Sequence, residues 1–267
     1  MYAHRGGAAL RPENTVAAFD HGLSMGADGL ELDVRLSRDG IVVVHHDATL
    51  ERTSSGRGRL ADHTSDELAR TDVGYWFRPM DAPVVGRGGA RELPAEAFPF
   101  RGHDLGVPTL RTILQRYPDV PLIIELKVND AELGRRTVDV LRETRSVDRV
   151  ALGSFYRRPL RAARAYEPRI RTGAAALETR WALYRSWVGW PLGRAEYREF
   201  QVPERSGPTS IISPRFIRHA HRAGFPVKVW TVNDAADMRR LLDWGADALI
   251  TDRPDIAVPL ASMSAAG

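Results

Sequence analysis

Short apolar segments alternate with longer amphipathic segments along most of the chain. The apolar segments have the length of β-strands, and the amphipathic ones repeat their apolar positions with the period of an α-helix. Strands are predicted at residues 1–5, 29–36, 41–46, 121–127, 149–155, 170–175, 226–232 and 248–251. Helices are predicted at residues 16–25, 110–116, 131–144, 159–166, 213–223 and 235–244. Eight strands with intervening helices in 267 residues predict an α/β fold, a (β/α)8 TIM barrel.

The second and third predicted strands lie too close in sequence for a parallel crossover. Only residues 37–40 separate them, whereas a crossover needs about a dozen residues or more. Asp39-Gly40 is a common turn dipeptide between antiparallel strands. We therefore predict an antiparallel hairpin between strands 2 and 3, which distorts the barrel.

The hairpin also predicts a pairing register. A turn centred on residues 38–39 places Glu31 opposite His46 and Asp33 opposite Val44. Glu31 and Asp33 share one face of their strand because side chains alternate with a period of two. His46 would join that face across the ladder, so this hairpin would gather two acids and a histidine.

The remaining sequence is interpreted as one barrel domain over residues 1–260. Residues 48–107 have weak periodicity and many Gly, Pro and Arg residues, which predicts a loop-rich insertion over the C-terminal face of the barrel. Residues 261–267 are predicted to form a frayed tail. Residues 26–33 and 245–252 resemble each other, each with a Gly, a turn and a strand that ends in an acid.

Composition narrows the chemistry. Apolar residues make up 43% of the chain, enough for a full core, and the absence of cysteine excludes disulfides and thiolate metal sites. A metal would therefore be held by oxygen or imidazole, which favours Mg²⁺ or Ca²⁺, with Mn²⁺ as a further option. The net charge is +4, but the basic residues form no stripe, so no nucleic-acid partner is predicted.

The sequence contains no segment with the length of a transmembrane helix and no signal peptide at its start. A cytoplasmic protein is expected on this basis. His4 lies so near the beginning that a preceding segment, if one exists, would change this expectation.

Three carboxylates lie within strand-like segments: Glu31, Asp33 and Glu125. Burying an acid in an apolar strand is costly unless it is paired or binds a cation. One interpretation is a set of ion pairs with nearby basic side chains, namely Arg5, Arg35 and Lys127. The interpretation we prefer is an oxygen cage for a divalent cation, with coordination positions left for water and substrate.

Two histidines lie at strand ends beside charged neighbours, His4 beside Arg5 and His46 beside Asp47. A pair of imidazoles can divide the proton transfers of phosphodiester cleavage, one as base and one as acid. Arg5 and Lys127 would supply fixed positive charge to the phosphate. Lys127 is also placed to pair with Glu125, two residues earlier.

Other segments allow two interpretations each. Asn14 or Thr15 could cap the helix that begins near residue 16, or contact substrate. Trp230 and Phe155, each at a strand end, could line a substrate pocket or fill the barrel. Residues 181–200 combine many aromatics with arginines, which indicates either a packed capping element or an interfacial segment that makes transient contact with a membrane surface.

Taken together, these segments resemble the glycerophosphodiester phosphodiesterase family. The matching pieces are Ala3-His4-Arg5-Gly6, Pro12-Glu13-Asn14-Thr15, Glu31-Leu32-Asp33-Val34, His46-Asp47, Glu125-Leu126-Lys127, Ser154-Phe155, Trp230-Thr231-Val232-Asn233 and Thr251-Asp252-Arg253-Pro254.

The resemblance implies a distorted barrel like that of phosphatidylinositol phospholipase C. It implies Mg²⁺ or Ca²⁺ on the three acids, acid–base roles for His4 and His46, and phosphate contacts for Arg5 and Lys127. The implied reaction is hydrolysis of a small glycerophosphodiester to glycerol 3-phosphate and an alcohol.

Two departures from the family pattern affect the expected pocket rim. Tyr156 stands where the family often has a polar residue, and the linker over residues 48–107 is longer than usual. Two alternatives therefore remain: a lysophospholipase D-like phosphodiesterase acting on lysophospholipids, and a non-catalytic lipid-headgroup-binding protein.

Overall fold

The computed structural model describes residues 1–80 and 93–265. Residues 81–92 of the predicted insertion and residues 266–267 of the predicted tail lie outside the described residues. The division into one barrel domain with an insertion stays a prediction.

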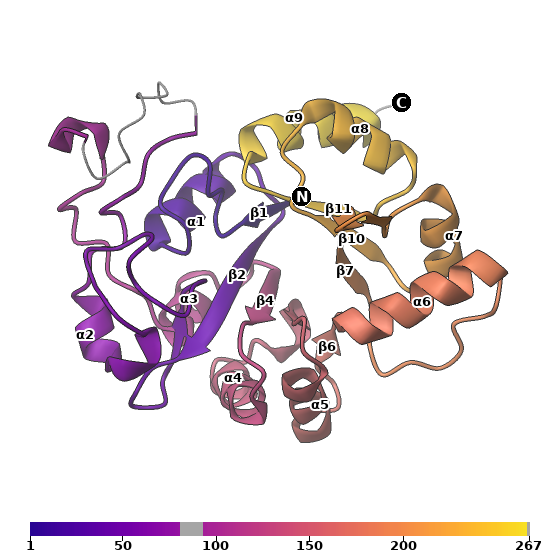
Figure 1. Cartoon of the computed structure of the whole chain (residues 1–267), viewed down its shortest axis with the longest axis horizontal. Helices are drawn as coiled ribbons and strands as arrows, with labels where there is room; N and C mark the ends of the chain where they lie inside the picture. The colour runs from indigo at the N-terminus through magenta and orange to yellow at the C-terminus, as the bar shows by residue number, and fades with distance from the viewer. Residues whose placement is uncertain (81–92, 266–267) are drawn as a thin grey trace.

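A curled sheet of parallel strands forms the centre of the molecule (Figure 1). In the described residues its order is β6-β5-β4-β2-β1-β11-β10-β7, and each neighbouring pair is parallel. A parallel bridge between Gly173 and Glu199 joins the two ends of the sheet. This arrangement confirms the predicted distorted TIM barrel. The strands are β1 (Tyr2–His4), β2 (Gly29–Leu36), β4 (Leu122–Leu126), β5 (Val150–Gly153), β6 (Arg171–Thr172), β7 (Phe200–Pro203), β10 (Val227–Trp230) and β11 (Ala248–Thr251).

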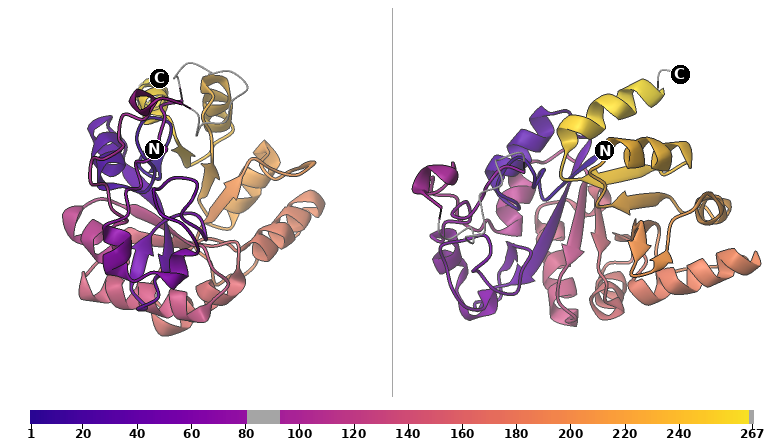
Figure 2. Two further views of the ribbon diagram at one scale, coloured as in Figure 1. Left: turned by 60° about the vertical axis from the view of Figure 1, so that its left-hand side comes forward. Right: turned by 45° about the horizontal axis from the view of Figure 1, so that its top comes forward.

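Helices surround the sheet, as both views of Figure 2 show. The six predicted helices are confirmed, with ends that differ by at most about two residues. They are α1 (Val16–Ser24), α3 (Leu110–Arg116), α4 (Ala131–Glu143), α5 (Arg157–Tyr166), α7 (Pro214–Arg222) and α8 (Ala235–Asp243). Sequence reasoning missed α2 (Ser65–Ala69), α6 (Ala176–Val188) and α9 (Pro254–Ala265). Helix α9 includes residues 261–265, which were predicted to fray.

Several short elements are also present in the described residues. They are the 3₁₀ helices η1 (Leu60–Asp62), η3 (Ala95–Ala97) and η4 (Val147–Arg149), and the hairpin strands β8 (Arg205–Ser206) and β9 (Thr209–Ser210). Within residues 1–80 and 93–265, every helix is too short or too polar to cross a lipid bilayer.

One of the eight predicted strands was misassigned. The prediction counted residues 41–46 as a barrel strand, but β3 (Val42–Val44) is an additional strand that pairs antiparallel with β2. The barrel strand that was missed is β7. Its side chains alternate between buried and half-buried, so only Phe200 and Val202 carry the apolar signal.

The hairpin between β2 and β3 is antiparallel, as predicted, but the predicted pairing register is wrong by one residue. Val34 lies opposite Val44 and Leu36 opposite Val42. Gly40 has φ of +75°, a left-handed conformation that takes one more residue into the turn. Because the ladder ends at Val44, His46 reaches the site from beyond the strand.

The apolar core is divided between two large clusters. One runs from Ala3 to Ala175 and packs β1, β2, β4 and β5 with helices α1, α3, α4 and α5. The other runs from Ala174 to Ala257 and packs β7, β10 and β11 with α6 to α9. A smaller cluster beneath the insertion includes Val43 and Leu68.

Candidate active site

The carboxyl ends of parallel barrel strands converge on one face, and three neighbouring strands bring their polar residues together there. His4 on β1 lies in register with Glu31 on β2, and Asp33 lies in register with Glu125 on β4. A cavity of about 600 Å³ opens at this face. Its lining includes His4, Arg5, Glu31, His46, Glu125, Lys127, Phe155 and Trp230. Asp33 is fully buried behind that wall.

The three acids form a compact group. Glu31, Asp33 and Glu125 can each place one carboxylate oxygen within 4.8 Å of the other two. Asp33 Oδ1 and Glu125 Oε1 are buried and accept no hydrogen bond from the described residues. Buried anionic oxygens without donors are suited to a hard divalent cation, so the residues present fit such an ion.

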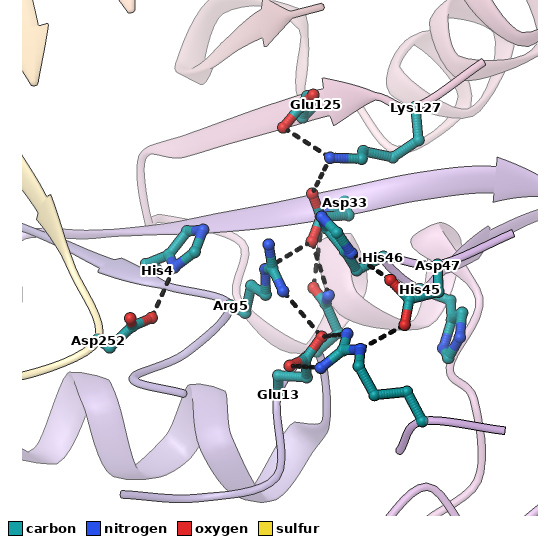
Figure 3. A network of polar contacts seen from close by, with 12 residues as sticks. His4, Arg5, Glu13, Asp33, His45, His46, Asp47, Glu125, Lys127 and Asp252 are labelled. Carbon is teal, nitrogen blue, oxygen red and sulfur yellow. Dashed lines mark hydrogen bonds and ion pairs between the residues drawn. The ribbon is translucent and has the colours of Figure 1, made fainter. Parts of the chain in front are cut away.

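Ion pairs are also present in the acid group. Lys127 Nζ lies 3.1 Å from Glu125 Oε2 and 3.5 Å from Asp33 Oδ1, and Arg5 Nε lies 3.0 Å from Asp33 Oδ2 (Figure 3). Arg35, the third cation suggested by the sequence, instead donates through Nε to the carbonyl of His46. Three carboxylates therefore share two cations, which leaves negative charge for a metal.

Burial and the crowding of like charges change the pKa values of the three acids. Burial and the neighbouring Asp33 raise the pKa of Glu31 to about 8. Burial also raises the pKa of Glu125. Asp33 is different: burial opposes its charge, but Arg5 and Lys127 outweigh burial and hold its pKa below the ordinary value. A divalent cation relieves this kind of repulsion.

The ring of His4 is oriented by a carboxylate from the last barrel strand. Its Nδ1 lies 2.6 Å from Asp252 Oδ1, and its Nε2 lies 3.8 Å from Glu31 Oε2. Asn233 donates to Asp252 Oδ2 at 2.8 Å and so fixes the orienting carboxylate. Burial lowers the pKa of His4, but Glu31 and Asp252 outweigh burial and raise it overall.

His46 is held in a matching way. Its Nδ1 lies 2.6 Å from Asp47 Oδ1, and Arg52 pairs with the same carboxylate. Burial lowers the pKa of His46. Burial opposes the charge of Asp47, yet Arg52 and His46 bring its pKa down to about 2. In both dyads a carboxylate on Nδ1 leaves Nε2 for substrate.

The Pro12–Thr15 segment supports the site and also starts a helix. Thr15 is the N-cap of α1 and accepts a hydrogen bond from Ala18 N. Asn14, at φ of +58°, donates to Asp33 Oδ2 at 2.9 Å. The cap is therefore Thr15, and Asn14 positions an acid of the cage.

Glu13 connects the two sides of the site. It accepts from Arg5 Nη1 at 2.9 Å and from both terminal nitrogens of Arg52, at 2.6 and 2.8 Å. Since Arg52 also pairs with Asp47, a chain of charged contacts runs from the Arg5 side to His46 (Figure 3).

Both predicted aromatics line the cavity rather than fill the barrel. The rings of Phe155 and Trp230 meet edge to face, with centroids 5.6 Å apart. Phe155 is about half exposed. His45 points elsewhere, since it is buried with Nε2 3.3 Å from the carbonyl of Thr49.

Sequence reasoning assigned no role to Asp252, Glu13 or Arg52. A signal for Asp252 existed, because the repeated segment at residues 245–252 ends in this acid just as residues 26–33 end in Asp33. Arg52 lies within a segment without periodicity, so nothing in the sequence pattern separates it from other loop arginines.

Comparison with known proteins identifies relatives of this chain. A model of the glycerophosphoryl diester phosphodiesterase family matches residues 4–256. The probable glycerophosphodiester phosphodiesterase 2 of Mycobacterium tuberculosis is 32% identical, over 95% of this chain and 87% of that protein. The glycerophosphodiester phosphodiesterase of Caldanaerobacter subterraneus subsp. tengcongensis is 27% identical, over 97% and 96%. A mouse protein named lysophospholipase D GDPD1 is 24% identical, over 94% and 82%.

Solved structures share the fold. An Oleispira antarctica phosphodiesterase in complex with the product sn-glycerol-3-phosphate has a TM-score of 0.75 and 25% identity, covering 98% of this chain and 96% of that one. A glycerophosphodiester phosphodiesterase from Agrobacterium tumefaciens has a TM-score of 0.73 and 27% identity, covering 97% and 98%.

Proposed function

The chain belongs to the glycerophosphoryl diester phosphodiesterase family and is a phosphoric diester hydrolase, and from this premise we propose that it hydrolyses glycerophosphodiesters with a divalent cation and two histidines. The proposed products are glycerol 3-phosphate and the free alcohol. One observation carries the proposal: three clustered carboxylates, two of which have buried oxygens that accept no hydrogen bond from the described residues, share a site with two carboxylate-oriented imidazoles.

Glu31, Asp33 and Glu125 would hold the cation. Mg²⁺ or Ca²⁺ fits an all-oxygen donor set, and Mn²⁺ accepts the same ligands. Bound there, the ion would supply positive charge against the phosphoryl oxygens.

Arg5 and Lys127 line the same cavity and would neutralise the charge that builds up as a fifth oxygen approaches phosphorus. One imidazole would take the proton from the attacking oxygen, which belongs to water or to the neighbouring glycerol hydroxyl. In the second case a cyclic glycerol phosphate would form as the alcohol leaves, and water would then open the ring to give glycerol 3-phosphate. The other imidazole would give a proton to the alkoxide as its bond to phosphorus breaks. Phe155 and Trp230 would form an apolar wall for the carbon skeleton.

The metal requirement is tested with glycerophosphocholine and an assay for released glycerol 3-phosphate. EDTA treatment is expected to abolish release, and added Mg²⁺ or Ca²⁺ to restore it. Glu31→Gln and Glu125→Gln should each lower kcat/KM by about a hundredfold or more, because each removes a charged ligand. Glu167→Gln, a buried acid paired with Arg142 away from the site, is the matched control. Full activity of either cage variant would contradict the proposal.

A lysophospholipid substrate is the second candidate. Tyr184 and Trp187 of α6 line the cavity that holds the catalytic residues, which would suit an apolar chain. The likeness to a lysophospholipase D points the same way. Comparing kcat/KM for glycerophosphocholine and lysophosphatidylcholine decides between them. The alternative of a non-catalytic binding protein is set aside, since both histidines and all three acids converge.

A further inference from the structure

Helix α6 and the turn after it concentrate exposed apolar side chains on one surface. Of the thirteen large apolar side chains that are exposed in the described residues, six lie between residues 177 and 190. We call this surface the α6 aromatic face; it comprises Leu177, Trp181, Tyr184, Trp187, Val188 and Trp190. Val188 is 74% exposed, Trp181 66% and Trp190 65%. The helix lies at the outer edge of the molecule in both views of Figure 2.

The opposite side of α6 already supplies the contacts that hold the helix in the fold. Ala182, Leu183 and Ser186 are buried on that side, and α6 packs against α7. On the outer side, Tyr184 contacts both Trp181 and Trp187, with centroids 6.3 and 5.4 Å apart. The aromatics therefore form a continuous patch that the fold itself leaves in water, an arrangement typical of interaction surfaces.

The charge around this patch is positive. Residues 176–198 contain four arginines and two glutamates. Arg164 pairs with Glu178 at 3.1 Å and with Glu196 at 3.4 Å, and Arg157 also pairs with Glu178 at 3.5 Å, so two arginines of α5 balance the two acids. Arg180 and Arg194 are exposed and make no ion pair within residues 1–80 and 93–265.

A third arginine shapes the patch. Arg185 donates to the carbonyls of Pro191 and Leu192, at 3.2 and 2.8 Å. Together with the bond from Trp190 N to the Arg185 carbonyl, these bonds fold the segment after the helix back onto its last turn. The exposed position of Trp190 is thus fixed by specific contacts.

The patch is continuous with the catalytic cavity. Leu177, Arg180, Tyr184 and Trp187 recur at helical spacing and line the cavity that also contains His4 and Glu125. A partner that binds the α6 aromatic face would therefore lie at the rim of that cavity.

We propose that the α6 aromatic face docks onto an anionic lipid bilayer. Trp181, Val188 and Trp190 enter the headgroup region, where large amphipathic rings are stable, while Arg180 and Arg194 meet lipid phosphates. A bilayer is favoured over a protein partner because its own headgroups carry the phosphodiester chemistry that the adjoining cavity accepts. This choice of partner rests on the proposed phosphodiesterase function, but vesicle binding itself does not require hydrolysis.

The test measures co-sedimentation with vesicles of phosphatidylcholine mixed with phosphatidylglycerol, against vesicles of phosphatidylcholine alone. The wild-type chain should bind the mixed vesicles more tightly, and added salt should weaken the binding. The double variant Trp181→Ala/Trp190→Ala should bind about tenfold more weakly. Arg194→Glu should cost about fivefold or more.

Matched controls lie on other helices. Tyr166→Ala removes an exposed aromatic at the far end of α5, and Arg239→Glu reverses an exposed charge on α8. Both should bind vesicles like the wild type. Neither Trp181 nor Trp190 lines the cavity, so the double variant should hydrolyse glycerophosphocholine at the wild-type rate.

Equal vesicle binding by the double variant and the wild type would overturn the proposal. So would a wild-type dimer in analytical ultracentrifugation that the double variant loses, because the face would then belong to a second copy. Vesicle binding without any diester hydrolysis would leave docking intact and contradict the proposed reaction instead.

Discussion

Two aspartates determine how the imidazoles of this site can act. Asp252 accepts a hydrogen bond from Nδ1 of His4, and Asp47 accepts one from Nδ1 of His46, each at 2.6 Å. Both rings therefore have Nε2 left for the cavity. Symmetric orientation of this kind suits a reaction that needs one proton taken and one proton given.

Division of the proton transfers between the two histidines predicts a dependence on the leaving group. His4→Ala and His46→Ala should both be nearly inactive on glycerophosphocholine, whose alkoxide needs a proton. On an aryl phosphodiester, whose phenolate leaves without one, the variant that lacks the acid should recover most of its activity, and the variant that lacks the base should not. Steady-state kcat/KM on both substrates checks this. Recovery by both variants, or by neither, would contradict separate roles.

Asp47 predicts a pH-dependent contribution to stability. Its folded pKa of about 2 lies below the unfolded value of about 3.9, so its charge stabilises the fold above pH 4 and this contribution is lost as pH falls from about 4 through about 2. Asp47→Asn should lower the free energy of unfolding by about 1–2 kcal/mol at pH 7. Urea unfolding at several pH values should show the difference shrinking below about pH 4. Asp119→Asn, at an exposed loop position, is the control, and a difference that stays constant with pH would refute the assignment.

The sequence predicted the chemical groups of the site better than it predicted their supports. His4, Glu31 and Glu125 could be recognised because polar residues in apolar strands are unusual. Asp252, Glu13 and Arg52 act by orienting other side chains, and their contacts join segments up to 248 residues apart. Such pairings depend on how the barrel closes, which no local pattern contains.

The turn after β1 packs closely against helix α1 at Gly6. At Gly6 a Cβ would lie 2.6 Å from the backbone carbon of Ala18, and φ there is +86°. The helix start therefore packs directly against the turn that follows His4. This contact positions the first imidazole relative to the cage.

Gly6→Ala should destabilise the protein by about 3 kcal/mol, from left-handed strain and steric overlap together. Gly40→Ala is the matched control: its φ is +75°, but nothing lies within 4 Å of the added Cβ, so about 1 kcal/mol is expected. Urea unfolding of both variants measures the difference. Similar losses for the two would show that the approach to Ala18 is unimportant.

Elements whose apolar positions repeat with a clear period were predictable from the sequence, and elements without such a repeat were not. The six confirmed helices carry amphipathic patterns, whereas α6 is apolar and aromatic on its exposed side as well and so lost its period. Strand β7 has four residues, of which two face the core. The hairpin register failed because the sequence did not reveal that Gly40 adopts a left-handed conformation.

At the scale of the whole molecule, the acid group predicts that the proposed metal binding stabilises the fold. Three carboxylates with two cations repel one another in the metal-free fold. An ion that binds only the folded state stabilises it by about 2.7 kcal/mol at one hundred times its Kd.

Mg²⁺ or Ca²⁺ should therefore raise the melting temperature by roughly 5–10 °C at saturating concentration. Glu31 has a pKa of about 8, so the metal-free fold has to protonate this acid at pH 7. Glu31→Gln removes that cost, so the metal-free variant should melt higher than the metal-free wild type, and added metal should change its melting temperature little. Scanning fluorimetry with and without EDTA measures both. A metal-induced shift of the same size in Glu31→Gln would contradict the cage.

The divided core has an evolutionary consequence. The two histidines, the three acids of the cage and the two cations proposed to bind phosphate all come from residues 4–127. The first core cluster packs that part of the chain. The second cluster packs the part that supplies α6 and Trp230, which form the opposite wall of the cavity. Exchange of residues 174–257 for those of a relative should thus transfer that relative's substrate preference and leave the hydrolytic chemistry unchanged, provided that the new segment has an aspartate at position 252 to orient His4.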